Sequence, residues 1–288
     1  QITTSKIKGT VTDNKGEALF GATVVVLHVP TGTTSGTIAQ ENGNYTVPNL
    51  RVGGPYKVTF SFVGYASQEV NNIFLTLGKT TNVDAKLAEE GTKLDEIVIT
   101  SSKSKIFNND RTGAQTSISS QQLKRLPTIS RSQSDFTRLE PTASNGSFGG
   151  RNDQFNNFSL DGSIFNNPFG LDAATPGGQA NAQPVSLDAI EQVSVSIAPY
   201  DVTLSGFTGA SVNAVTKSGT NTLTGTVYGF FRNEDLTGGK IRGQDVFKGQ
   251  LNQNQYGVSI GGPIIKDKLF FFANFEKDET TELASGFI

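Results

Sequence analysis

Apolar and polar residues alternate with period two in a series of short runs between Lys6 and Leu87. One run places Val58, Phe60 and Phe62 on the same face. Turn residues separate the runs, as at Asn14–Gly16. Alternation in short runs with frequent turns is typical of a small β-sandwich. We therefore predict seven short strands that form an antiparallel sandwich.

The pattern changes after about residue 103, where short helical and extended signals are interleaved. Ser119–Gln122 fits a helix capping box, and Ser132–Asp135 repeats that signal. Phe155–Leu160 reads as a strand that ends at Asp161-Gly162, a dipeptide that favours a hairpin turn, and Ser211–Thr216 reads as a further strand. Elements mixed in this order predict a small α+β domain.

Three longer alternating runs follow, at Thr222–Phe231, Gln255–Gly261 and Leu269–Glu276. Strands of about ten residues with one apolar and one small or polar face are typical of outer-membrane β-barrels. A soluble hairpin gives the same alternation, so the pattern alone leaves both open.

The segment Leu94–Thr100 stands between the first two regions and differs from both. Two carboxylates precede three β-branched residues, which is a strongly extended composition. Such a segment can add as a strand to the open sheet edge of a partner. From the residues alone, an ordinary linking strand is favoured over a docking strand.

Composition narrows the range of partners and chemistries. The net charge of -2 and pI near 5.6 disfavour nucleic acid, which calls for a basic face. Cys 0 removes disulfides and thiolate chemistry. Met 0 predicts that Gln1 is a processed or artificially made N-terminus, and a removed secretory signal would explain it. No run approaches the ~18 apolar residues of a spanning helix, so any membrane contact must use strands.

Nothing in the chain predicts catalysis. His28 is the single histidine, too few for a zinc site, and nucleophile-elbow, phosphate-loop and metalloprotease motifs are absent. Turn chemistry explains the acidic pair Asp13 and Glu17 and the pair Asp161 and Asp172. We predict a protein that is not an enzyme, with no catalytic residue, metal or cofactor.

Specific motifs of the first region resemble a known family. They are KGTVTD at Lys8–Asp13, GATVVV at Gly21–Val26, NGNYTV at Asn42–Val47 and VGY at Val63–Tyr65. Together they resemble a carboxypeptidase-regulatory-like domain, which implies a transthyretin/Ig-like sandwich without catalytic activity of its own.

The rest of the chain resembles the plug and first barrel strands of TonB-dependent outer-membrane receptors, in the Oar-like and SusC-like branch. The motifs lie at Gly149–Gly162, Leu187–Asp201, Gly209–Asn221 and in the barrel-like runs. By the same resemblance, the segment at the junction is the TonB box. Its matching residues are Asp95, Glu96, Ile97, Val98, Ile99 and Thr100.

The resemblance implies a domain order: sandwich 1–90, linker with TonB box 91–102, plug 103–221 and incomplete barrel 222–288. A barrel of this class needs about 22 strands, so the chain is expected to be part of a longer receptor. The fold class is then mainly β with a small α+β domain.

The implied function is energy-coupled import across the outer membrane of a Gram-negative bacterium, with the sandwich in the periplasm. TonB is the expected partner, and an external peptide, protein or oligosaccharide is the expected ligand. Substrate contacts are expected in the loop between Phe165 and Pro184, at Asn166, Asn167, Phe169 and Leu171. A surface lipoprotein partner stays open, as does the alternative of a non-transporting adhesion or pore-sealing module in the envelope.

Overall fold

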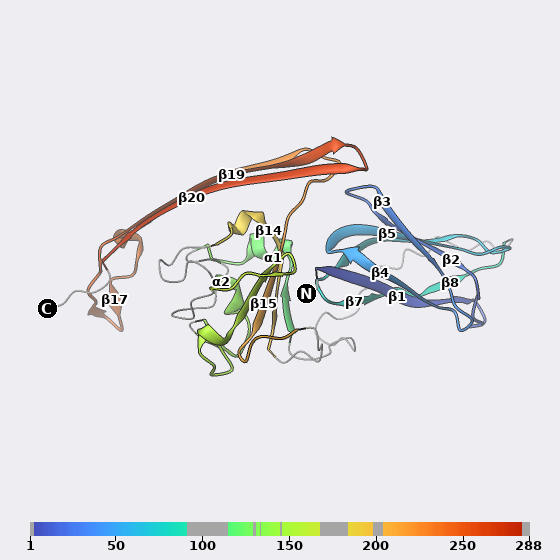
Figure 1. Cartoon of the computed structure of the whole chain (residues 1–288), viewed down its shortest axis with the longest axis horizontal. Helices are drawn as coiled ribbons and strands as arrows, with labels where there is room; N and C mark the ends of the chain where they lie inside the picture. The colour runs from blue at the N-terminus through green and yellow to red at the C-terminus, as the bar shows by residue number, and fades with distance from the viewer. Residues whose placement is uncertain are drawn as a thin grey trace. The chain divides into compact units, whose positions relative to one another are not determined.

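The computed structural model describes residues 3–90, 115–128, 131–132, 134–144, 146–167, 184–197 and 204–283 (Figure 1). The chain divides into two compact units, residues 1–217 and residues 218–288.

Between residues 3 and 90, all of them described, eight strands form two sheets around one core. One sheet has the order β4-β1-β7, with β8 also paired to β1, and the other has the order β3-β2-β5-β6. The strands are β1 (Thr4–Asp13), β2 (Thr23–His28), β3 (Thr33–Ile38), β4 (Asn44–Arg51), β5 (Gly53–Ser61), β6 (Gln68–Leu75), β7 (Thr80–Asn82) and β8 (Ala85–Leu87).

The core of this sandwich follows from the alternation of the sequence. Ile7 and Val11 of β1 face Val24 of β2 and Val58 and Phe60 of β5, and all five are fully buried. Every member of this core lies between residues 7 and 87. The sandwich therefore contains its own hydrophobic core.

Two expectations for the sandwich were wrong. It has eight strands and not seven, and β7 and β8 run parallel to β1, so the pairing is mixed and not purely antiparallel. The alternation of Val83, Ala85 and Leu87 with polar residues from Asn82 to Lys86 predicts one strand, but the structure interrupts it at Val83 and Asp84. Thr10 N donates a hydrogen bond to Asp84 Oδ1 at 2.9 Å. In an uninterrupted strand, a backbone oxygen would accept this hydrogen bond instead.

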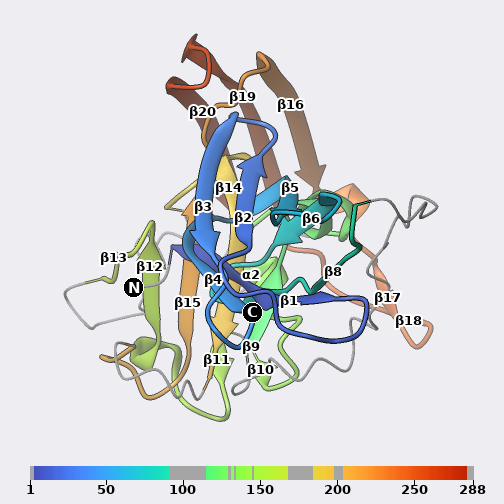
Figure 2. The same cartoon turned by 90° about the vertical axis from the view of Figure 1, so that its right-hand side faces the viewer.

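In the described parts of residues 115–217, five strands form one sheet of order β13-β12-β15-β14-β9, in which β12, β15 and β14 lie side by side (Figure 2). We call this region the plug-like domain. Its strands are β9 (Gln115–Ile118), β12 (Asn157–Leu160), β13 (Ser163–Ile164), β14 (Ile190–Ser196) and β15 (Ser211–Thr216). Its other elements are α1 (Ser120–Arg125), α2 (Ser134–Thr137), the hairpin β10 (Ala143–Ser144) and β11 (Ser147–Phe148), and the 3-10 turns η1 (Asp153–Phe155) and η3 (Leu187–Ala189).

The structure confirms a helix cap, a turn and a strand that the sequence predicts for this domain. Gln122 Oε1 accepts a hydrogen bond from Ser119 N at 3.0 Å, as the capping box predicts, and Leu123 is buried. Asp161 and Gly162 both have positive φ, 47° and 83°, as the turn of a tight hairpin requires. The strand Ser211–Thr216 has the predicted bounds.

In residues 218–283, three strands pair antiparallel in the order β16-β19-β20. They are β16 (Thr224–Asn233), β19 (Leu251–Ile265) and β20 (Leu269–Glu282). Between β16 and β19 the chain forms η4 (Glu234–Leu236) and a short hairpin of β17 (Lys240–Ile241) and β18 (Gln244–Asp245). We call β16, β19 and β20 the barrel-type sheet. The second and third strands are longer than predicted, because the ladder between them continues through polar residues at one end and through residues 262–265 at the other.

Candidate functional site

The strand β9 is the first described element after the predicted TonB box, and it lies at the end of the plug-like sheet. Residues 115–118 pair antiparallel with residues 196–193 of β14. Among the described residues no strand pairs with the other edge of β9. The predicted box residues, Asp95 to Thr100, lie outside the described residues.

A buried carboxylate also holds this edge strand. Thr116 Oγ1 donates a hydrogen bond to Glu140 Oε2, and Glu140 is 6% exposed. Sequence patterns gave no sign of this pair, because 24 residues separate its members. The edge strand is therefore fixed by one ladder, by this side-chain bond and by the burial of Ile118.

The plug-like sheet has one apolar and one polar face. Val193 and Val195 of β14 pack with Phe158, Val212 and further core residues. The alternate positions carry small polar side chains that are also buried: Asn157, Ser159, Ser194, Ser196, Ser211 and Asn213. Ser159 Oγ donates to Asn213 Oδ1 at 3.1 Å, so parts of this polar face pair with each other.

Asn166, the first of the predicted ligand contacts, forms hydrogen bonds within the plug-like domain. Asn166 Oδ1 accepts from Phe158 N at 2.6 Å, and Asn166 Nδ2 donates to Asn157 Oδ1 at 2.9 Å. The side chain thus fixes the start of the predicted ligand loop to β12. Asn167 follows it in the chain, whereas Phe169 and Leu171 lie outside the described residues.

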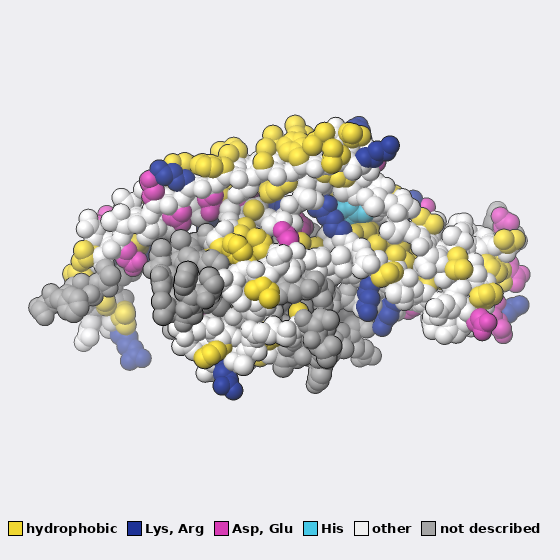
Figure 3. Space-filling model, viewed as in Figure 1, with side chains coloured by type: hydrophobic (Ala, Val, Ile, Leu, Met, Phe, Trp, Pro, Cys, Tyr) yellow, Lys and Arg dark blue, Asp and Glu magenta, His cyan; other side chains and the backbone are white. Residues whose placement is uncertain are grey.

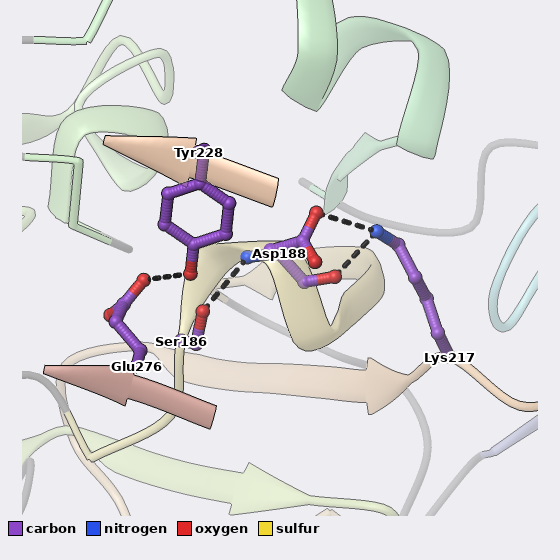
Figure 4. Close-up of polar contacts among 5 residues, drawn as sticks. All are labelled: Ser186, Asp188, Lys217, Tyr228 and Glu276. Carbon is purple, nitrogen blue, oxygen red and sulfur yellow. Dashed lines mark hydrogen bonds and ion pairs between the residues drawn. The ribbon is translucent and has the colours of Figure 1, made fainter. Parts of the chain in front are cut away.

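The last residue of the first unit is anchored to η3. Lys217 Nζ donates to the Asp188 backbone oxygen and lies 3.4 Å from Asp188 Oδ1, while Ser186 Oγ accepts from Asp188 N at 3.2 Å (Figure 4). Lys217 N also donates to Ala189 O at 2.8 Å. These bonds fix the end of the plug-like domain to η3.

The register of the barrel-type sheet separates its two faces. Val227, Val258 and Phe275 lie in one row across the three strands, and they are 84%, 44% and 62% exposed. Hydrophobic side chains follow this sheet along the upper edge of the view in Figure 3. A contiguous exposed apolar surface of this kind suits a lipid or protein environment.

The opposite face of the barrel-type sheet is polar. Tyr228, Gly257 and Glu276 form a row, and Tyr228 Oη donates a hydrogen bond to Glu276 Oε2 (Figure 4). A Cβ added at Gly257 would lie 2.4 Å from Tyr228 Oη, so the tyrosine ring occupies the space that the glycine leaves. Such cover of a strand glycine by an aromatic ring stabilises curved sheets.

His28 sits in the sandwich as a structural residue. Its Nδ1 lies 2.6 Å from Thr31 Oγ1, and its ring packs 4.7 Å from that of Tyr56. Burial, assisted by the positive charge of Arg51, lowers the pKa of His28 to about 4. In the described part of the chain no group of three or more His, Asp or Glu residues is placed to hold a metal ion, and no helix is long and apolar enough to cross a membrane.

Two sequence profiles match the chain. The carboxypeptidase regulatory-like domain matches residues 6–88, and an outer membrane beta barrel domain matches residues 215–287. The chain therefore combines a carboxypeptidase regulatory-like sandwich with outer-membrane barrel sequence.

Curated relatives identify the wider class. The chain is 29% identical to the TonB-dependent transporter Oar of Myxococcus xanthus, over 94% of this chain and 26% of the relative. It is 32% identical to the TonB-dependent receptor SusC of Bacteroides thetaiotaomicron, over 41% of this chain and 10% of the relative. The chain is thus homologous to TonB-dependent transporters and receptors, which are not enzymes, and it spans about a quarter of the length of the first.

A solved structure with partial similarity is the siderophore receptor PirA from Acinetobacter baumannii. It is 21% identical and covers 58% of this chain and 24% of its own, with a TM-score of 0.42.

Proposed function

We propose that this chain belongs to an energy-coupled outer-membrane transporter, in which residues 103–221 form a plug that controls passage through a barrel. Asp95 to Thr100 would bind the periplasmic protein TonB by strand addition, and the sandwich would lie in the periplasm. The homology to TonB-dependent transporters and the outer-membrane barrel match support this proposal.

The observation that carries the proposal is the position of β9. Gln115, the first described residue after residues 95–100, begins an edge strand. In the part of the chain that the structure describes, the four-residue ladder to β14, the Thr116–Glu140 bond and the burial of Ile118 hold that strand. Edge strands with few contacts are elements that open at low free energy. This arrangement favours a plug whose first response to a pull is the release of β9.

The two faces of the barrel-type sheet support the same function. The apolar row through Val258 suits lipid, and the row through Tyr228 and Glu276 suits a water-filled interior. We propose that the external ligand is a peptide, protein or oligosaccharide, as the sequence resemblance implies. The ligand loop would use Asn167, Phe169 and Leu171, with Asn166 both contacting ligand and anchoring the loop.

A pair of substitutions tests the TonB contact. Val98→Pro removes a backbone N–H and fixes φ, whereas Val98→Ala keeps the N–H and serves as the matched control. Peptides covering residues 92–103 with each sequence are titrated against the periplasmic domain of TonB. We expect the alanine peptide to bind within a few-fold of wild type and the proline peptide to bind at least about tenfold more weakly, from the loss of main-chain pairing.

The same substitutions are then placed in the complete receptor. Energy-dependent uptake should fall with Val98→Pro while ligand binding at the cell surface persists. Equal TonB affinity of all three peptides would refute the box assignment and favour a static envelope scaffold.

A further inference from the structure

The turn that joins β6 to β7 contains a buried leucine that belongs to neither hydrophobic core. Leu77 is 1% exposed, yet it is absent from the core of the sandwich and from the core of the plug-like domain. A leucine on a surface turn gains burial only when a second surface covers it. The contacts of this turn identify that surface within the same compact unit.

The side chain of Gln192, in β14, pairs with this turn as a peptide group would. Its Oε1 accepts from Leu77 N at 2.9 Å, and its Nε2 donates to Leu75 O at 3.0 Å. Gln192 is 3% exposed. A buried amide with both its oxygen and its nitrogen bonded to one backbone segment contributes specificity, because a shift of the segment would leave polar groups unpaired.

The surface under the turn is the polar face of the plug-like sheet. Leu77 and Gly78 line a residual space of about 20 Å³ together with side chains of the sheet and Leu204. A space of this size holds about one water molecule. The sheet residues that line it are Gln115, Ser194, Ser196, Ser211 and Asn213.

The start of β5 in the sandwich approaches the same strand. A Cβ added at Gly53 would lie 3.2 Å from Glu191 Oε1, the neighbour of Gln192. Gly53 has a φ of 93°. The turn around Leu77 and the start of β5 therefore both meet the beginning of β14.

We propose that the sandwich docks on the polar face of the plug-like sheet, with Gln192 as the docking residue and the turn around Leu77 as its partner. Docking fixes the position of the sandwich relative to the plug-like domain. The two described residues that flank residues 91–114, one in each domain, are then fixed relative to each other. This inference goes beyond transport, because it holds whether or not residues 95–100 bind TonB.

Amide hydrogen exchange of the full chain in detergent micelles tests the contact. In wild type the Leu77 amide should be protected, and Gln192→Ala should raise its exchange rate by at least about tenfold, the effect of one lost hydrogen bond and of undocking. Gln192→Glu keeps the acceptor for Leu77 N but loses the donor to Leu75 O, so it should give an intermediate rate.

Gln154→Ala, at an exposed glutamine of the same domain, is the matched control and should leave the Leu77 rate unchanged. The amides of Val58 and Val195, in the two cores, report whether each variant is folded. Free exchange of the Leu77 amide in wild type, or an unchanged rate in Gln192→Ala, would overturn the proposal.

Cross-linking tests docking with Gln192 intact. The natural chain has no cysteine, so Leu77→Cys combined with Ser194→Cys introduces two thiols on opposite sides of the same small space. We expect a disulfide under mild oxidation. Val63→Cys with Ser194→Cys is the control, because Val63 is 93% exposed on the sandwich. Equal cross-linking of the two pairs would also refute docking.

Discussion

The buried His28 makes the stability of the sandwich depend on pH. Its pKa is about 4 in the folded chain and 6.5 as an ordinary side chain. The folded state therefore keeps the imidazole neutral below pH 6.5, where the unfolded chain takes up a proton. Stability is complete above pH 6.5, falls as the pH falls, and reaches its lower level below pH 4.

The magnitude follows from the size of this shift. A shift of about 2.5 pH units corresponds to roughly 3 kcal/mol in total, at about 1.4 kcal/mol per unit. Between pH 7 and pH 5 the expected loss is about 2 kcal/mol. The causes are the burial of the ring against Tyr56 and the charge of Arg51, both of which oppose a second positive charge.

Two measurements check this value. Residues 1–90 contain their own core, so urea unfolding of this domain at pH 7 and pH 5 gives the change in the free energy of unfolding. His28→Gln is the control, because glutamine cannot take up a proton and should remove most of the pH dependence. His28 is the single histidine, so its ring proton gives one NMR titration curve. Titration near pH 6.5, or an equal loss of stability in both proteins, would refute the reasoning.

Three further predictions concern close contacts. Gly9→Ala should destabilise the sandwich by about 3 kcal/mol in urea unfolding, because the added Cβ would lie 2.0 Å from Val83 O, and a wild-type midpoint would contradict this. Asn166→Ala should cost about 1–3 kcal/mol of plug stability in thermal unfolding, since it leaves buried polar partners unpaired; an unchanged transition would show that the loop is anchored otherwise. Gly257→Ala should destabilise the barrel-type sheet by about 1–3 kcal/mol in micelles, and combination with Tyr228→Ala should recover part of that loss, whereas strict additivity would exclude the ring contact.

Local signals were read correctly from the sequence, because they depend on neighbours in the chain. The turn at Asp161-Gly162, the cap at Ser119 and the strand Ser211–Thr216 all follow from residues within a few positions. The two-faced alternation of the barrel-type strands is likewise visible in the sequence and confirmed by their register.

Long-range contacts account for what the sequence could not predict. The split between β7 and β8 depends on Asp84 bonding to Thr10, 74 residues away. The role of Gln192 depends on a turn 115 residues earlier. A lone glutamine in a strand gives no local sign of such a partner. The assignments at Asp95 to Thr100 and at the ligand loop stay predictions, as do the domain boundaries.

The serine- and asparagine-lined surface of β14 and β15 affects what release of the sandwich would expose to water. An apolar interface would, on opening, expose apolar surface that promotes aggregation. Hydroxyl and amide groups instead exchange their bonds for water with a small net change in free energy. In the proposed docked arrangement, release of the sandwich would therefore expose mainly hydroxyl and amide groups of β14 and β15, which water can satisfy.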